Sequence, residues 1–250
     1  MRLDGSHLEA GLSLIADVAN GPLTRTDWAE QLLRGEILTG SLKAGERLKI
    51  GELQERYPGL SPTPLREALS RLAGSGLVDV LPNRGMRVAP GSVEELRDVQ
   101  ANRALLEAIA FERSVGAGDE TWQREVKAAF DGLVVLSHEL ANLDDIGSAE
   151  LIRWENAHRR FHFSLLSRCG SPWLLRLVGI LYEQSVRYRY LTIRARPEFD
   201  QIAADHEAIY GAALSGDPTE SLAALRDHLN LTVEHAQDLD EVVIAGADEG

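Results

Sequence analysis

The chain has 250 residues, of which 44% are hydrophobic and 26% charged, a composition typical of a globular protein long enough for two domains. No apolar run reaches the roughly 20 residues of a membrane span, so we expect no membrane contact. Asp4, Glu9 and Asp17 stand where a signal peptide would be basic and then apolar, and the single cysteine, Cys169, excludes an internal disulfide. These features predict a cytoplasmic protein.

The net charge of −13 is unevenly distributed along the chain. Residues 21–90 hold ten Lys/Arg and eight Asp/Glu, a balance of +2, so the remaining residues carry −15. An acidic remainder repels phosphate, so any contact with nucleic acid would be confined to the basic face of this segment.

The first predicted helix runs from Trp28 to about Thr39, because apolar side chains recur there at helical spacing, with Thr26-Asp27 as its cap. Residues 1–20 before it are weakly patterned and are predicted to be an N-terminal extension. Residues 40–48, which contain two glycines, predict a turn into the next helix.

Two helices separated by a break follow this turn. The first spans Ile50–Tyr57, Pro58-Gly59 interrupts the pattern, and the second helix begins at Ser61. Ser61 suits the cap and Pro62 the first helical position. The second helix presents one apolar face, made of Leu65, Ala68, Leu69 and Leu72.

Two short strand-like runs, Leu77–Leu81 and Met86–Val88, come next and are joined by a turn that contains Arg84. Helix, turn, helix and then a tight hairpin is the plan of a winged helix-turn-helix, a module that reads DNA. Polar Thr63 and cationic Arg66 lie near the start of the second helix, where such a module faces bases and phosphates. A salt bridge on a solvated face is the alternative for Arg66.

The stretch GLSPTPLREALSRLAGSGLVDVLPNRGMRV, with LKAGERL before it, resembles the DNA-binding domain of the GntR family of bacterial transcription regulators over residues 24–89. The resemblance implies contacts with a double-stranded DNA operator from Arg47, Ser61, Thr63, Arg66, Arg71, Arg84 and Gly85. Pro62 departs from the pattern, because many members carry Arg between the Ser and the Thr. One contact of the family would then be missing here.

Residues 91–240 have the pattern of an antiparallel all-α bundle. Six amphipathic segments are predicted, at 93–116, 119–142, 148–168, 172–195, 199–215 and 218–238. The whole chain is thus predicted to be mainly α, with a winged helix-turn-helix domain at 21–90, the helical domain at 91–240 and an acidic tail at 241–250.

Four histidines lie in three of these helical segments. His158 and His162 are four residues apart, which places both rings on one helix face, and His206 and His228 lie on later helices. Antiparallel packing would allow all four to meet at a metal ion. The alternative is that they are ordinary surface or core histidines, as we expect for His7, His138 and His235.

The helical part resembles the FCD effector-binding domain that accompanies the FadR-type branch of the GntR family. Four stretches carry the resemblance, namely Arg103–Glu107, His158–His162, Asp205–Ile209 and Arg226–Leu229. It implies a divalent metal bound by an Asp and three His, matched here by His162, His206 and His228, with His158 in place of the Asp. Nitrogen ligation of this kind favours Zn²⁺ or Ni²⁺.

The resemblance also implies a small carboxylate effector, bound by the metal and by Arg103. A salt bridge between Arg103 and Glu107, one turn on, is the alternative role. The predicted protein is a ligand-responsive transcription regulator, a repressor that acts as a homodimer and is not an enzyme. Two alternatives stay open, an all-α metal-dependent hydrolase and a metal-free FCD regulator that binds a fatty acyl ligand.

Overall fold

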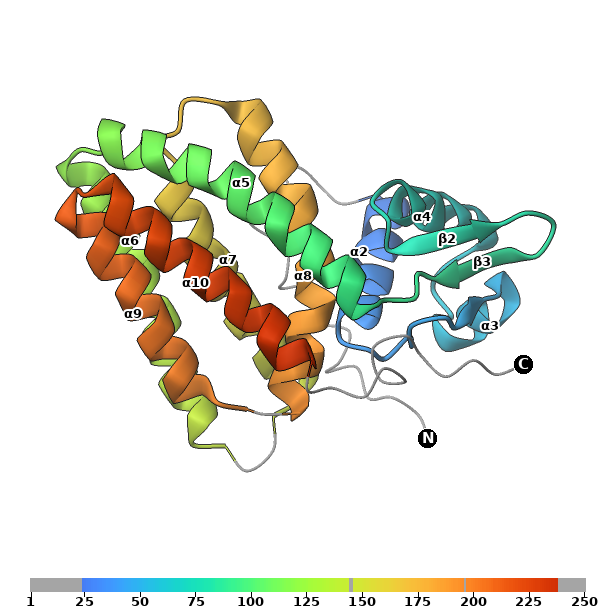
Figure 1. The fold of residues 1–250 in the computed structure, drawn as a ribbon. Coiled ribbons are helices and arrows are strands. Elements are labelled where there is room, and N and C mark those ends of the chain that lie inside the picture. The colour runs from blue at the N-terminus through green and yellow to red at the C-terminus, as the bar shows by residue number, and fades with distance from the viewer. Residues whose placement is uncertain (1–23, 144–145, 196, 238–250) are drawn as a thin grey trace. The chain divides into compact units, whose positions relative to one another are not determined.

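The computed structural model describes residues 24–143, 146–195 and 197–237, and these residues form two compact units that separate between Ser92 and Val93 (Figure 1). The extension at 1–20 and the tail at 241–250 lie outside the described residues. In the described ranges, no helix has both the length and the apolar character needed to cross a membrane.

The N-terminal unit is a winged helix-turn-helix, as predicted. Its helices are α2 (Arg25–Leu38), α3 (Ile50–Arg56) and α4 (Pro62–Gly74). Its strands, β1 (Arg47–Leu48), β2 (Val78–Leu81) and β3 (Gly85–Val88), form an antiparallel sheet in the order β1-β3-β2. The predicted turn at 40–48 thus ends in a strand, which pairs Leu48 with Met86 and which is too short to show periodicity.

Helix α2 begins three residues earlier than predicted, because its cap is Thr24 and not Thr26-Asp27. The Asp27 amide donates to the Thr24 hydroxyl at 3.1 Å, and the Thr24 amide donates back to the Asp27 carboxylate at 3.0 Å. This reciprocal capping box satisfies two amide groups at once. Hydrogen bonds from Thr24, and then from Arg71, lower the pKa of Asp27 to about 2.

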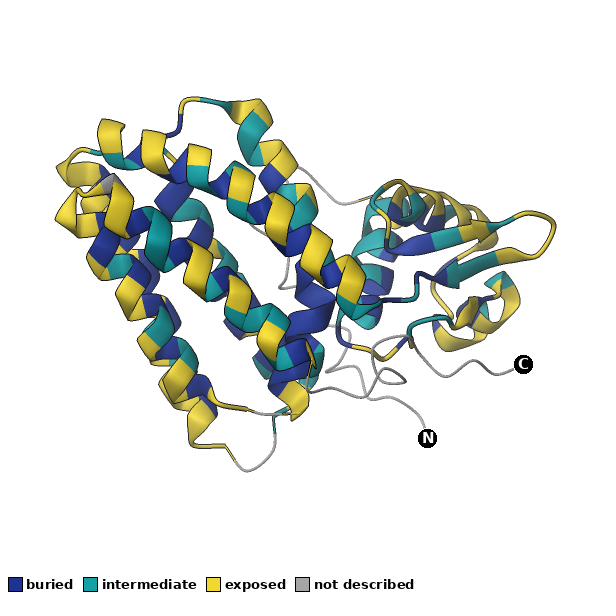
Figure 2. Cartoon of the chain, viewed as in Figure 1, coloured by how far each residue is buried: buried dark blue, intermediate teal, exposed yellow. Residues whose placement is uncertain are grey.

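The core of this unit lies between α2, α4 and the sheet. The predicted apolar face of α4 is buried, with Leu65, Ala68, Leu69 and Leu72 all at 1% exposure or less. It packs against α2, whose buried side chains include Leu33 and Ile37 (Figure 2). This packing leaves the opposite face of α4 exposed.

The C-terminal unit is a bundle whose described helices match the six predicted segments to within two residues at each end. They are α5 (Val93–Ala117), α6 (Glu120–Ala141), α7 (Ser148–Leu166), α8 (Pro172–Ala195), α9 (Phe199–Ser215) and α10 (Pro218–Gln237). Helix α5 packs against α10, α8 and α7, and α6 packs against α7 and α9 (Figure 1). The histidine-bearing helices α7, α9 and α10 therefore surround one interior.

Candidate functional site

The start of α4 is fully solvent-facing, with Ser61, Pro62 and Thr63 all exposed. Ser61 is the N-cap and has extended backbone angles, but its side chain makes no capping hydrogen bond, contrary to the sequence prediction. A cap side chain accepts from the second or third amide of the helix, and the third residue here is Pro64, which has none. The Ser61 hydroxyl is therefore available to a partner outside the helix.

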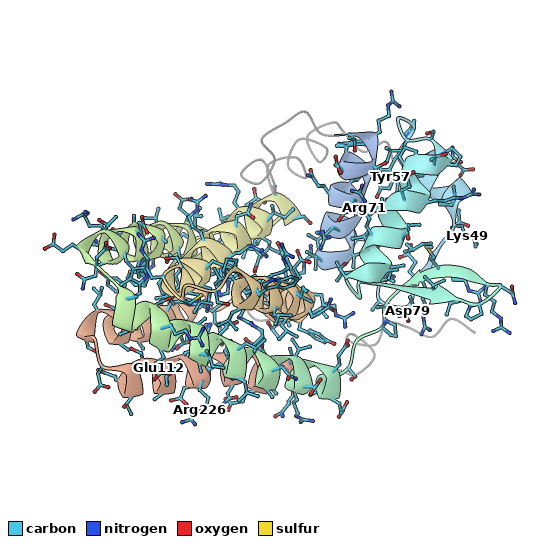
Figure 3. The ribbon with its side chains drawn as sticks, turned by 90° about the horizontal axis from the view of Figure 1, so that it is seen from above. Lys49, Tyr57, Arg71, Asp79, Glu112 and Arg226 are labelled. Carbon is cyan, nitrogen blue, oxygen red and sulfur yellow. The ribbon has the colours of Figure 1, made fainter. Side chains whose placement is uncertain are left out.

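The cations expected to meet DNA fall into two groups. Arg47, Arg66 and Arg84 are exposed, and none of them forms an ion pair with another described residue. Arg71 instead donates to Asp27 at 2.8 Å and to Glu30 at 3.1 Å, which holds it where α4 meets α2 (Figure 3). Its guanidinium is half exposed, so it can still meet a phosphate.

The wing presents Arg84 in a turn whose backbone requires a glycine. Gly85 has φ +86°, a conformation that side chains with a Cβ rarely adopt. A surface hollow beside the wing is lined by Arg47, Arg84 and three further cations that the sequence analysis did not single out. These are Lys43, Lys49 and Arg87. In the sequence, the signal for Lys43 and Lys49 is that they lie close to Arg47, so that three cations fall within residues 43–49.

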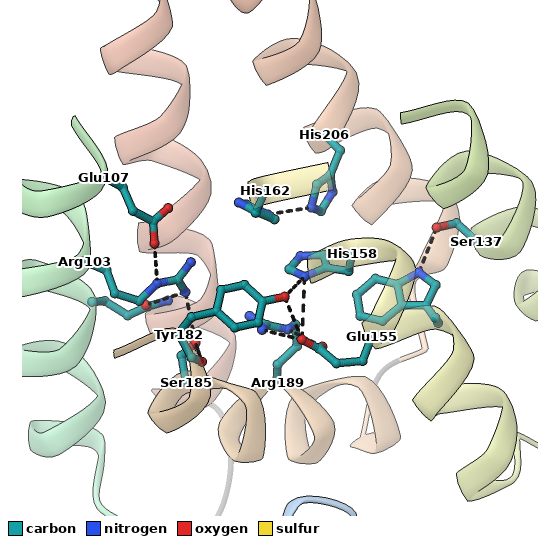
Figure 4. A network of polar contacts seen from close by, with 12 residues as sticks. Arg103, Glu107, Ser137, Glu155, His158, His162, Tyr182, Ser185, Arg189 and His206 are labelled. Carbon is teal, nitrogen blue, oxygen red and sulfur yellow. Dashed lines mark hydrogen bonds and ion pairs between the residues drawn. The ribbon is translucent and has the colours of Figure 1, made fainter. Parts of the chain in front are cut away.

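The structure brings the four histidines together in the interior of the bundle. His158 and His162 come from α7, His206 from α9 and His228 from α10, and one ring nitrogen of each lies within 4.8 Å of the others. Figure 4 shows His158, His162 and His206 close together. His158, His162 and His206 are at most 2% exposed. His228 is partly exposed, although its Nδ1 is buried.

All four imidazoles favour the neutral form that binds metals. Burial lowers the pKa of His206 to about 4. Burial also lowers the pKa of His158, His162 and His228 well below the ordinary value, and neighbouring arginines and histidines add to the shift. At neutral pH these rings therefore offer lone pairs without first releasing a proton to solvent.

For His206, hydrogen-bond geometry shows directly which ring nitrogen carries the proton. His206 Nδ1 lies 2.6 Å from the Ile202 carbonyl oxygen, which can only accept, so Nδ1 carries the proton. The lone pair of His206 is then on Nε2, 3.3 Å from His162 Nε2. Two other ring nitrogens, His162 Nδ1 and His228 Nδ1, are buried without a hydrogen-bond partner among the described residues.

This donor set fits a divalent transition metal. Four neutral nitrogens converge from three helices, and imidazole binds Zn²⁺ at about 2.0–2.1 Å. Burying lone pairs without a partner is costly, and a shared ion would bind the four ring nitrogens that converge here. The cluster can therefore hold one metal ion.

A second layer of buried polar groups, whose roles no sequence pattern predicts, supports His158. His158 Nδ1 lies 2.7 Å from the Tyr182 hydroxyl, and that hydroxyl donates to Glu155 Oε1 at 2.7 Å (Figure 4). Arg189 donates to both oxygens of Glu155, at 2.9 and 3.0 Å. Burial, followed by Glu155, raises the pKa of Tyr182 well above its ordinary value, so the phenol stays neutral.

Arg103 lies in a buried ion pair, the alternative role considered for it. Its Nε donates to Glu107 Oε1 at 2.7 Å, and its Nη1 donates to Gln100 and to Ser185. Its Nη2 and the second oxygen of Glu107 have no partner among the described residues. That Arg103 binds the effector stays a prediction, and Nη2 is the group that would donate a hydrogen bond to an effector carboxylate.

A cavity of about 130 Å³ adjoins three of the four clustered histidines and also His235. His158, His206 and His228 line it, together with Arg189 and polar side chains of α8, α9 and α10 that include Thr192, Gln201 and Asp205. Neither His162 nor Arg103 lines this cavity. Arg189 is therefore the arginine that lines the cavity, although its guanidinium already donates hydrogen bonds to Glu155.

Comparison with known families accounts for both units. The model of bacterial regulatory proteins of the gntR family matches residues 26–88, and the model of the FCD domain matches residues 98–231. The chain belongs to the GntR family. Its DNA-binding domain is the winged helix-turn-helix, and its FCD domain contains the histidine cluster.

Relatives of this GntR-family chain are transcription regulators. The HTH-type transcriptional regulator BphR of Paraburkholderia xenovorans (strain LB400) is 36% identical over 207 residues, 81% of each chain. The HTH-type transcriptional repressor GlaR of Escherichia coli (strain K12) is 31% identical over 203 residues, 79% of this chain and 89% of GlaR. The solved structure of E. coli McbR/YncC has the same fold, with a TM-score of 0.70 at 21% identity over 86% of this chain and 98% of its own.

The family and these relatives are regulators and not enzymes, so the hydrolase alternative is set aside. The structure adds a reason within the site. Glu155 Oε1 lies 3.9 Å from His158 Nδ1, but Tyr182 donates to Oε1 and Arg189 donates to both oxygens of this carboxylate. A general base needs a free lone pair at the reacting atom.

The burial of the Arg103–Glu107 ion pair leads to a prediction about the stability of the FCD domain. Arg103→Met should destabilise the FCD domain by about 3–5 kcal/mol, because Glu107 would be left as an unpaired buried charge. Arg103→Met/Glu107→Leu should recover most of that loss, because the charge is removed as well. Differential scanning calorimetry of the full chain measures both, and equal stability of the single variant and the wild type would contradict the assignment.

Proposed function

We propose that this GntR-family protein is a cytoplasmic transcription repressor that binds its operator as a homodimer. A divalent metal, Zn²⁺ or Ni²⁺, is held by His158, His162, His206 and His228, and a small carboxylate effector binds that metal. The observation that carries the proposal is the convergence of four neutral imidazoles inside a domain attached to a DNA reader.

The DNA contacts are proposed for the exposed start of α4 and for the wing. Ser61, Thr63 and Arg66 approach bases and phosphates in the major groove, while Arg47, Arg84 and the Gly85 backbone meet the adjacent phosphates. Their exposure and the absence of ion pairs at the three arginines among the described residues support these roles. Arg71 serves as a phosphate contact that is also anchored to Asp27.

Arg66→Ala should weaken operator binding about 10- to 100-fold, the range for loss of one good base contact. The folded state should be little affected, because Arg66 is exposed and forms no ion pair with another described residue. Arg124→Ala on α6, which removes the same charge from the exposed surface of the other unit, is the control. Fluorescence anisotropy at fixed salt measures both, and an unchanged affinity for Arg66→Ala would remove this residue from the interface.

The metal is proposed to have four nitrogen ligands. With His158 where an Asp stands in many FCD domains, the site keeps the full +2 charge of the ion, which attracts an anion. Nitrogen donors without a carboxylate favour Zn²⁺ or Ni²⁺ over Mg²⁺ or Mn²⁺. The chemistry that the metal supplies is Lewis acidity toward a carboxylate oxygen.

Purified protein should contain about one Zn²⁺ or Ni²⁺ per chain, and His162→Ala should lose most of it, because a ligand is removed and a cavity takes its place. His138→Ala, which changes an exposed histidine on α6, should keep the metal. Inductively coupled plasma mass spectrometry measures the content. A wild-type protein free of transition metal after expression in zinc- and nickel-supplemented medium would refute the site.

The effector is proposed to be a small polar carboxylic acid. The cavity of about 130 Å³ is comparable with a cavity of about 150 Å³ that holds benzene, so it suits about half a dozen non-hydrogen atoms. A fatty acyl chain is too large for it. We assign the effector carboxylate to the metal. A thermal-shift screen of small carboxylic acids on wild type and Arg103→Lys tests whether Arg103 Nη2, which does not line this cavity, also contacts the carboxylate.

The homodimer is proposed to form through α5 and α8. These helices pack against each other, and each exposes large apolar side chains, Leu105 and Ile109 on α5 and Trp173, Leu177 and Ile180 on α8. Exposed apolar surface of this kind marks an interface, and paired recognition helices suit a two-fold operator. Analytical ultracentrifugation of Trp173→Glu should show monomer, whereas Val135→Glu on α6 should remain dimeric.

A further inference from the structure

His158 differs from a carboxylate ligand in having a second nitrogen that needs a partner. We propose that Tyr182 and Glu155 are positioning residues that fix His158 in the Nδ1–H tautomer and so make it a competent metal ligand. This inference rests on the metal binding proposed above, but the hydrogen bonds that carry it join side chains of the protein and do not involve the metal.

The three groups form one buried hydrogen-bonded chain between α7 and α8. His158 Nδ1 is 2.7 Å from the Tyr182 oxygen, and that oxygen is 2.7 Å from Glu155 Oε1 (Figure 4). His158 and Tyr182 are 1% exposed and Glu155 is 6% exposed. Solvent therefore does not compete for these bonds, and their direction is set by the protein.

The direction of each bond follows from the donors that surround Glu155. Arg189 donates one hydrogen bond to each carboxylate oxygen, so both oxygens act as acceptors. The single proton of the Tyr182 hydroxyl must then point at Glu155. The Tyr182 oxygen is left as an acceptor, so the proton between it and His158 belongs to Nδ1.

A proton on Nδ1 leaves Nε2 as the lone-pair nitrogen of His158. The same outcome is imposed on His206 by the Ile202 carbonyl, whereas His162 Nδ1 and His228 Nδ1 have no such partner among the described residues. Partners that fix the tautomer of a metal-binding histidine are known to raise metal affinity. The Glu155 carboxylate, which is paired with Arg189, lies two hydrogen bonds behind the ligand and is not itself a ligand.

Tyr182→Phe isolates the hydroxyl from the rest of the side chain. The ring of Tyr182 packs against the guanidinium groups of Arg103 and Arg189, at 4.9 and 5.0 Å from its centre, and phenylalanine keeps these contacts. Tyr188→Phe is the matched control, because Tyr188 is also buried on α8 and its hydroxyl donates to Glu95 at 2.6 Å, away from the histidines.

Zinc affinity, measured by competition with a chromophoric chelator, should fall about 10- to 100-fold for Tyr182→Phe and less than about threefold for Tyr188→Phe. Equal losses in the two variants would mean a general loss of structure and would overturn the inference. An unchanged affinity for Tyr182→Phe would overturn it as well.

The tautomer is measured separately, by ¹⁵N NMR of the imidazole nitrogens in metal-free protein, with His158→Gln to assign the signal. Wild type should show His158 protonated on Nδ1, and Tyr182→Phe should move the proton partly or wholly to Nε2. A wild-type His158 protonated on Nε2 would overturn the inference. If wild type binds no zinc, the proposed metal site fails, and the NMR result still decides the role of Tyr182.

Discussion

The burial of polar groups inside the bundle is the constraint on which the rest of the FCD domain depends. Four imidazoles and two arginine–glutamate pairs, Arg103–Glu107 and Arg189–Glu155, lie in an interior that should otherwise be apolar. Each group needs a partner, because an unpaired buried charge or donor costs several kcal/mol. The partners come from different helices, so the polar core determines how those helices pack.

These bonds tie the helices into one unit. Arg103 connects α5 to Ser185 on α8, Arg189 connects α8 to α7, and His162 meets His206 across α7 and α9. A ligand that draws the histidine nitrogens together must therefore move bonds between helices. Only residues 89–92 separate strand β3 of the DNA-binding domain from α5. In the proposed mechanism, an effector selects one arrangement of the FCD domains and with it one spacing of the recognition helices.

Much of this organisation could be predicted from the sequence, because it depends on local patterns. Apolar periodicity predicted all six bundle helices and the buried face of α4, and the spacing of His158 and His162 indicated a shared face. Residues that act through distant contacts could not be predicted. Glu155 is one turn from His158, but its role depends on Tyr182 and Arg189, which reach it from another helix.

The errors in predicting the caps of α2 and α4 also arise because the outcome depends on contacts with other residues. Thr24 and Thr26 are equally good caps by residue type, and the choice between them is made by the Asp27 carboxylate and by Glu67, which takes the Thr26 hydroxyl. At Ser61 the residue type was right for the N-cap, but Pro64 removes the third amide, one of the two that a cap side chain can bind. Strand β1 exists only because β3 lies beside it.

Operator binding in response to the effector is the most direct measurement of the proposed mechanism. The acid that binds the zinc-loaded protein should weaken operator binding by about 5- to 150-fold, the usual range of a coupling between two sites. It should have no effect on metal-stripped protein or on His162→Ala. An operator affinity that is the same with and without metal and acid would contradict control through the histidine site.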